Sequence, residues 1–399
     1  MSMHTARHRH RWWIAACAAV LAVIGGLVAV TEVRIAGDLL ERDGLEAFYT
    51  QPADALSGDP GSIVKSEPLL GVPMDTRAWR IMYRSTDLHG DPVVATGVVV
   101  TPLGPAPAGG RTVVSWGHPT TGSAASCAPS RSLDPYIGIE GMRVLLDRGY
   151  TVVATDYTGM GTEGPDSYLI GVTEGHNVLD AVRAAQAIPA AEASSDVVLW
   201  GHSQGGQAVL FAAELAEEYA PELDIRAVAA AAPAADLKAL MKTHLDDISG
   251  VTIGSYAFTA FSEIYADRGA DIDAILTPEA VAIQPQMNAL CLLTHIEELH
   301  EIAGPVVGTF TSADPTTTEP WATLLEENSA GGTAFGAPLL IVQGLDDELV
   351  RPADTEVYVE HAKSLGMDVT YRTVRVATHG TIAYLGLFDL VEFLDRAGV

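Results

Sequence analysis

The sequence predicts an α/β fold built around one mostly parallel sheet. Short runs of β-branched residues alternate with stretches of helical periodicity, as a chain of βαβ units requires. Several runs are apolar without interruption (151–155, 197–200 and 339–342), which is typical of strands buried on both faces. With 399 residues, 48% of them hydrophobic, the chain is long enough for one large core.

The first 37 residues are interpreted as a signal peptide or a signal anchor. Histidines and arginines precede an uncharged apolar stretch at 12–30, close to the ~20 residues that cross a bilayer. Gly25-Gly26 and the small residues near Ala29 or Ala36 fit a cleaved signal instead. Both alternatives place the rest of the chain outside, because the arginines stay on the cytoplasmic side. A buried soluble helix is the third alternative.

The remainder of the chain is strongly acidic. Residues 38–399 carry 19 lysines and arginines against 50 acidic residues, a formal charge of −31. Such a surface repels phosphate backbones and anionic headgroups, so no nucleic-acid partner is expected. Cys127 and Cys291 are the only cysteines in this part, and an oxidising compartment predicts a disulfide between them. Two unrelated buried thiols are the alternative.

The expected elements follow the chain from a Pro/Gly-rich lead-in at 51–73. The first two strands are adjacent without a helix and fit an antiparallel hairpin at the sheet edge. Strands are expected at 77–84, 92–101, 111–116, 150–156, 196–200, 225–231, 338–342 and 369–376. Helices are expected at 139–148, 174–188, 205–219, 353–365 and 381–396.

The alternation stops in residues 233–336, which contain helical patterns and no convincing strand. We interpret this stretch as a helical cap inserted between the sixth and seventh strands. The sheet and its helices are then assigned to residues 38–232 and 337–399. The expected helices of the cap lie at 237–245, 253–265, 278–282 and 286–301.

Gly201-His202-Ser203-Gln204-Gly205 lies directly between an apolar strand and an apolar helix. A G-x-S-x-G motif in this context predicts a nucleophile elbow, in which a strained turn exposes the serine hydroxyl at the sheet edge. Glycines are needed at both ends because side chains there would collide with the neighbouring strand and helix. The elbow predicts an α/β-hydrolase fold with Ser203 as the nucleophile.

A nucleophilic serine needs a base, and the base needs an acid that orients it. In this fold the serine comes first along the chain, then the Asp or Glu, then the His. Asp347, in the turn after 339–342, has the better spacing for the acid, with Asp346 and then Asp236 as alternatives. His379 follows the last expected strand and precedes a helix, so it is the predicted base.

The oxyanion formed during attack needs two hydrogen-bond donors. The backbone N–H of Gln204 is the first, because it opens the helix after the elbow. The loop after the third expected strand should supply the second, through the backbone N–H or the hydroxyl of Thr120 or Thr121, since Pro119 has no N–H to donate.

No cofactor and no metal are predicted. The G-x-G-x-x-G at 159–164 follows a strand but is succeeded by Pro165 and a loop, whereas a dinucleotide site opens a helix. His295 and His300 are five residues apart, not the four that place two zinc ligands on one helix face.

At these motifs the chain resembles the secretory lipase family, the lipase A-like branch of the α/β-hydrolases. The matching segments are 116–122, 127–130, 155–161, the elbow, 343–347 and 378–380. Pro119 stands where the family usually has glycine. The resemblance implies lipase or esterase activity and a helical cap over the acyl pocket.

We therefore expect an exported lipase or esterase acting on a small-molecule or lipid ester. An acyltransferase that passes the acyl group to an alcohol is the first alternative. A non-catalytic binding protein of the cell envelope is the second. The sequence does not predict the oligomeric state.

Overall fold

The computed structural model describes residues 45–399. The predicted signal or anchor segment, residues 12–30, lies outside the described residues. The chain divides into two compact units, residues 1–50 and 51–399, and every element named below belongs to the second. No helix within residues 45–399 is both long enough and apolar enough to cross a bilayer.

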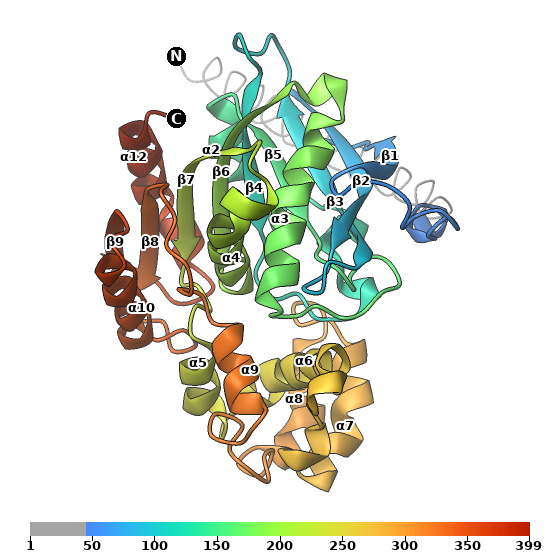
Figure 1. The fold of residues 1–399 in the computed structure, drawn as a ribbon, viewed down its shortest axis with the longest axis vertical. Helices are drawn as coiled ribbons and strands as arrows, with labels where there is room; N and C mark the ends of the chain where they lie inside the picture. Colours follow the sequence, from blue (N-terminus) through green and yellow to red (C-terminus); the bar gives the residue numbers. More distant parts are fainter. Residues whose placement is uncertain (1–44) are drawn as a thin grey trace, which may run out of the picture. The chain divides into compact units, whose positions relative to one another are not determined.

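The described strands form one sheet in the order β1-β2-β3-β5-β4-β6-β7-β8-β9 (Figure 1). The pairs β1-β2, β2-β3 and β3-β5 are antiparallel, and every pair from β5-β4 to β8-β9 is parallel. This pattern confirms the mostly parallel sheet. The strands are β1 (Ile63–Pro68), β2 (Thr76–Thr86), β3 (Pro92–Pro102), β4 (Arg111–Gly117), β5 (Thr151–Thr155), β6 (Ala193–His202), β7 (Asp224–Ala231), β8 (Leu339–Gly344) and β9 (Val369–Val374).

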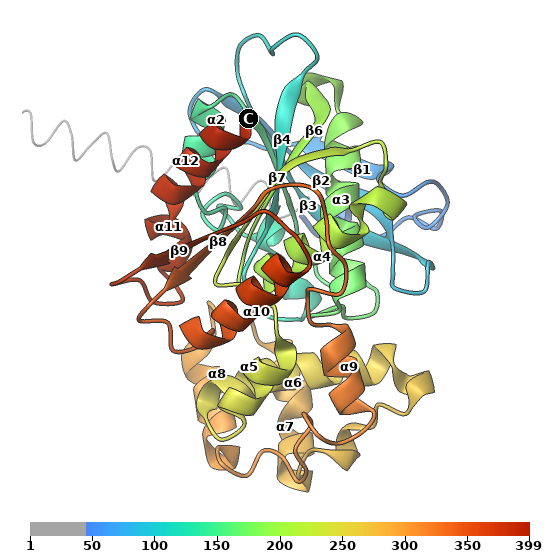
Figure 2. The same ribbon diagram turned by 60° about the vertical axis from the view of Figure 1, so that its left-hand side comes forward.

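Helices cover both faces of the sheet, so alternate residues of the central strands enter two separate apolar layers. In β6, Val197 and Leu199 face the layer of α3, α4 and α10, whereas Val198 and Trp200 face that of α2, α11 and α12. Figure 2 shows the two sets of helices on either side of the strands. The helices are α2 (Met142–Asp147), α3 (Gly171–Gln186), α4 (Gln204–Tyr219), α10 (Pro352–Ser364), α11 (Ile382–Leu385) and α12 (Leu387–Ala397).

A group of helices between β7 and β8 lies beyond one end of the strands (Figures 1 and 2). It has its own apolar core, in which Tyr256, Phe258 and Phe261 are fully buried. Its helices are α5 (Leu237–His244), α6 (Ile248–Ile264), α7 (Pro278–Ala289), α8 (Ile296–Ala303) and α9 (Trp321–Glu327). Short 3₁₀ turns occur at Ala125–Cys127, Pro129–Arg131, Pro189–Ala191, Ala266–Arg268, Ile272–Ala274 and Gly304–Val306.

Three local predictions were wrong. The lead-in holds an edge strand, β1, so the strands counted as sixth and seventh from sequence are β7 and β8. The single helix expected at 286–301 is divided between two helices, since α7 ends at Ala289 and α8 begins at Ile296. The helix expected at 381–396 breaks at Gly386, where a Cβ would lie 3.1 Å from a Val342 methyl carbon.

Candidate active site

Ser203 occupies the turn between β6 and α4 with a backbone that side-chain-bearing residues rarely adopt. Its φ is +57° and its ψ is −116°. The turn is fixed on both sides, because its N–H donates to the Ala231 carbonyl (3.0 Å) and its carbonyl accepts from the Ala234 N–H (3.0 Å). Backbone strain of this kind persists only where surrounding contacts determine it, as at functional sites.

Two glycines allow this turn to lie against the sheet. A Cβ on Gly205 would lie 1.9 Å from the Gly117 carbonyl oxygen at the end of β4. A Cβ on Gly201 would lie 2.1 Å from the carbonyl oxygen of Gly205 itself. Neither contact is sterically allowed, so any side chain at these positions would move α4 away from the strands.

The structure brings together the three side chains that sequence analysis selected. The Ser203 Oγ lies 2.8 Å from His379 Nε2, and His379 Nδ1 lies 2.9 Å from Asp347 Oδ2. They come from the turns that follow β6, β8 and β9, whose carboxyl ends lie at the same edge of the sheet. With Nδ1 donating to the carboxylate, Nε2 is left to accept the serine proton.

The surroundings of the three candidates for the acid, Asp347, Asp346 and Asp236, distinguish them. Asp347 is buried, and its other oxygen accepts from the N–H groups of Leu349 and Val350 at 2.9 Å each. Asp346 is exposed. Asp236 caps α5 by accepting from the Ala239 N–H at 2.9 Å. Only Asp347 is both held in place and directed at the imidazole.

Burial lowers the pKa of His379 from its ordinary value of 6.5. The hydrogen bond to Asp347 opposes this effect, and the nearby His202 ring, with its centroid 5.0 Å away, adds to it. The imidazole is therefore neutral, and able to accept a proton, at a lower pH than a histidine in water.

The two threonine candidates for the second oxyanion donor differ in their hydrogen bonds. The Thr121 hydroxyl donates to the Cys127 carbonyl (3.0 Å), so its single proton is engaged within the loop. The Thr120 hydroxyl is buried and lies 2.7 Å from the Tyr168 hydroxyl. If Tyr168 donates in that pair, the Thr120 proton remains for another acceptor. Gln204 begins α4, so its N–H has no partner within the helix.

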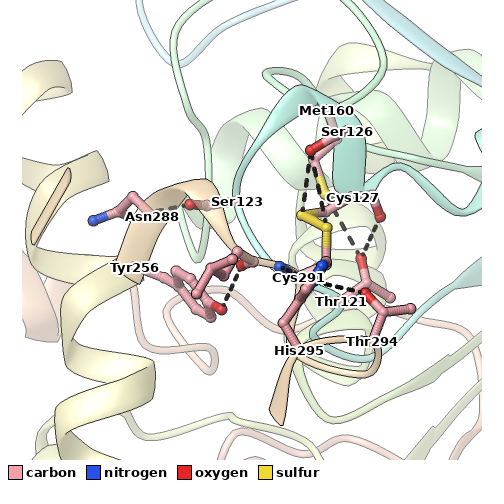
Figure 3. The surroundings of a disulfide bond; sticks show 11 residues. Thr121, Ser123, Ser126, Cys127, Met160, Tyr256, Asn288, Cys291, Thr294 and His295 are labelled. Atoms are coloured by element: carbon pink, nitrogen blue, oxygen red, sulfur yellow. Dashed lines mark hydrogen bonds between the residues drawn. A yellow bond between two sulfur atoms is a disulfide. The ribbon is translucent and has the colours of Figure 1, made fainter. Parts of the chain in front are cut away.

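The loop that carries these threonines is joined to the cap helices at several points (Figure 3). A disulfide links Cys127 to Cys291, as the sequence predicts, and Cys291 lies in the break between α7 and α8. The Leu292 N–H donates to the Thr121 carbonyl at 2.9 Å. Gly122 passes so close that a Cβ there would lie 2.7 Å from the Cys127 sulfur.

Sequence analysis missed two buried acids beside the site. The Glu140 Oε2 lies 2.9 Å from His202 Nδ1. Glu174, in the first turn of α3, accepts a hydrogen bond from the Gln204 side chain at 2.6 Å. Both lie far from the elbow in sequence, and no spacing rule connects them to it. No cluster of three or more metal-binding side chains occurs in residues 45–399.

Comparison with known proteins places this geometry in a family. The sequence profile described as secretory lipase matches residues 137–395, more than half of the chain. The chain belongs to the secretory lipase family. It is accordingly a carboxylic ester hydrolase by class, with an α/β-hydrolase fold.

Individual relatives are distant but cover most of the chain. Lipase A of Arthroderma benhamiae is 27% identical over 386 residues, covering 88% of this chain and 79% of that protein. A protein of Mycobacterium tuberculosis named "probable inactive lipase" is 25% identical over 360 residues, covering 84% and 77%. The closed-state structure of Candida antarctica lipase A superposes with a TM-score of 0.74 at 21% identity, covering 88% and 85%.

The disulfide between Cys127 and Cys291 should contribute to the stability of the protein. It closes a loop of 164 residues, for which chain entropy gives about 5 kcal/mol. Cys127→Ala and Cys291→Ala should each lower the free energy of unfolding, measured in urea, by the same amount as the double variant. Additive losses would contradict the pairing, as would the absence of a linked Cys127–Cys291 peptide after non-reducing digestion.

The lowered pKa of His379 should appear in the pH dependence of kcat/KM. The protonated imidazole cannot act as a base, so activity is lost as pH falls through this pKa and is retained above it. The acid limb should therefore have its midpoint below pH 6.5, with an ester that does not itself ionise. A midpoint above 6.5 would show that Asp347 outweighs burial.

Proposed function

We propose that this chain is an exported lipase or esterase that hydrolyses carboxylic esters through an acyl-enzyme on Ser203. The observation that carries the proposal is the unbroken series from Ser203 Oγ through His379 to Asp347, at 2.8 and 2.9 Å. These residues are 176 and 32 positions apart in sequence, so only the fold brings them together.

In the acylation step, Ser203 Oγ attacks the ester carbonyl carbon while His379 Nε2 takes the hydroxyl proton. The imidazolium is stabilised by Asp347 and the oxyanion by the Gln204 N–H and the Thr120 hydroxyl. When the tetrahedral intermediate collapses, its C–O bond to the alcohol breaks and the imidazolium returns the proton to that oxygen. The acyl group is left on Ser203.

Deacylation repeats these steps with water as the nucleophile. The neutral His379 takes a proton from water as the oxygen attacks the acyl carbon. Collapse then breaks the bond to Ser203 Oγ, which recovers the proton and releases the carboxylic acid. The presence of all three side chains in hydrogen-bonded order favours activity here, whatever the name of the mycobacterial relative.

We propose an uncharged, apolar ester as the substrate. We assign residues 233–336 the role of a cap over the acyl group, on a catalytic core of residues 38–232 and 337–399. The cap has an apolar interior, and the formal charge of −31 for residues 38–399 disfavours anionic substrates. Lipid esters are the substrate class that these properties favour.

Export is supported by three features of the chain. Residues 12–30 form an uncharged apolar stretch behind basic residues, and the family is described as secretory. The disulfide requires an oxidising compartment. Both a cleaved signal and a retained anchor would put the catalytic core outside the cell.

Replacing Ser203 with alanine should abolish turnover. The loss in kcat should be on the order of 10⁶, the size found when a triad nucleophile is removed. Release of p-nitrophenol from a short-chain ester measures it, and labelling by a fluorophosphonate should disappear in the same variant. Retained labelling or turnover in Ser203→Ala would refute the nucleophile assignment.

The two adjacent aspartates provide a matched pair of variants. Asp347→Asn should lower kcat by about 10⁴, because an amide cannot stabilise the imidazolium or hold its tautomer. Asp346→Asn should leave kcat unchanged, because that side chain is exposed. If Asp346→Asn were the damaging change, the acid assignment would be wrong.

A further inference from the structure

Glu174 is a buried carboxyl group beside the proposed oxyanion site that the mechanism above does not use. Its side chain has no exposed surface. One oxygen, Oε1, accepts from the Gln204 side-chain amide at 2.6 Å and from the Leu169 N–H at 3.0 Å. An acid placed in such a position is costly unless it is neutral or fully hydrogen-bonded.

The same carboxyl is connected to both proposed oxyanion donors. Gln204 supplies the first donor through its backbone. Leu169 is next to Tyr168, whose hydroxyl lies 2.7 Å from the Thr120 hydroxyl, the second donor. Leu169 itself has a φ of +59°, which a branched side chain rarely adopts, and Glu174 holds its N–H. Glu174 thus links the elbow to the turn that orients Tyr168.

Close packing of two helices makes this contact geometrically available. A Cβ on Gly175 would lie 3.0 Å from the Ala212 backbone nitrogen of α4, and one on Gly171 would lie 2.3 Å from the Phe211 ring. With glycine at both positions, α3 approaches α4 closely enough for Glu174 and Gln204 to meet near the helix N-termini.

The groups around Glu174 favour its uncharged form. Its pKa is raised to about 8: burial is the largest cause and the nearby Asp166 acts in the same direction, while the bonds from Gln204 and Leu169 act to lower it. Tyr157 and Tyr168 also face it, and both phenols have pKa values raised by burial. No cation is among the groups that act on it.

We propose that Glu174 is a positioning residue that braces Gln204 and the Leu169 turn as a neutral acid, and that its ionisation weakens oxyanion binding. This proposal rests on the Ser203 mechanism described above. An ionised Glu174 would place a second negative charge behind the site at the moment when the oxyanion forms. In surroundings of low dielectric constant, two such charges repel strongly.

The sign of the pH effect follows directly. Below pH 8 the acid is mostly neutral and the oxyanion donors meet no opposing charge. As pH rises through about 8 the carboxylate forms, so kcat should fall. KM should change little, because the ground-state ester carbonyl carries no full charge.

The experiment compares the pH profiles of kcat and KM for wild type and Glu174→Gln on p-nitrophenyl butyrate, from pH 6 to 10. Each profile is normalised to its own maximum, and the rate of ester hydrolysis in enzyme-free buffer at each pH is subtracted as the chemical background. Wild type should lose kcat with a midpoint near pH 8 at constant KM. Glu174→Gln, which keeps an acceptor oxygen but cannot ionise, should lack this alkaline limb.

Two further variants sharpen the result. Asp166→Asn should move the wild-type limb to lower pH, because the charge of Asp166 raises the pKa of Glu174. Glu214→Gln is a matched control on α4, since its carboxyl also has a pKa raised by burial but binds Gly331 and Thr333, away from the elbow. It should keep the wild-type limb. Thermal melts identify any variant that is not folded at a given pH.

An alkaline limb in Glu174→Gln identical to that of wild type would overturn the proposal. A wild-type alkaline effect that changes KM and leaves kcat constant would also overturn it. Failure of the Ser203 mechanism is a separate outcome, because it would appear as turnover above background in Ser203→Ala. If Glu174→Gln folds poorly, the Asp166→Asn variant decides the question. An alkaline fall in its kcat at the same pH as in wild type would likewise overturn the proposal.

Discussion

The active-site geometry depends on one steric constraint, the contact of helix α4 with the ends of β4 and β6. Between Gly205 and the Gly117 carbonyl there is no room for a single added carbon atom. This contact leaves the turn at Ser203 no relaxed conformation, which is why its φ is positive. It also places the first N–H of α4 beside the serine hydroxyl. The positions of the proposed nucleophile and of the first proposed oxyanion donor therefore follow from the same backbone approach.

The second donor depends on a different part of the molecule. The loop that carries Thr120 is joined to the cap region by the disulfide and by the hydrogen bond from the Leu292 N–H to the Thr121 carbonyl. Tyr168 then orients the Thr120 hydroxyl from the loop before α3. In the proposed mechanism, the cap helices therefore help to hold the second proposed oxyanion donor in place, in addition to covering the acyl group.

Sequence analysis selected the side chains that the structure brings together where the choice follows from a residue's immediate neighbours. The elbow can be recognised because strand, turn and helix are contiguous, and Asp347 was preferred to Asp346 because its spacing within one turn is local information. It failed where a role comes from tertiary packing. Nothing near Glu174 indicates that it will meet Gln204. The charged residues Lys65 and Glu67 obscured edge strand β1, and the break before Cys291 interrupts a pattern that reads as continuous helix.

Burial has opposite effects on the two kinds of titratable group in this site, and together they define its charge. Removing water lowers the pKa of His379 and raises that of Glu174, because in both cases the charged form is the one that loses hydration. Over the interval between these two pKa values, the base and the bracing acid are both neutral. The carboxyl group of Asp347 accepts hydrogen bonds from two backbone N–H groups and from the imidazole. In the proposed mechanism the positive charge that develops on the imidazole therefore faces Asp347, and a neutral Glu174 adds no opposing charge on the oxyanion side.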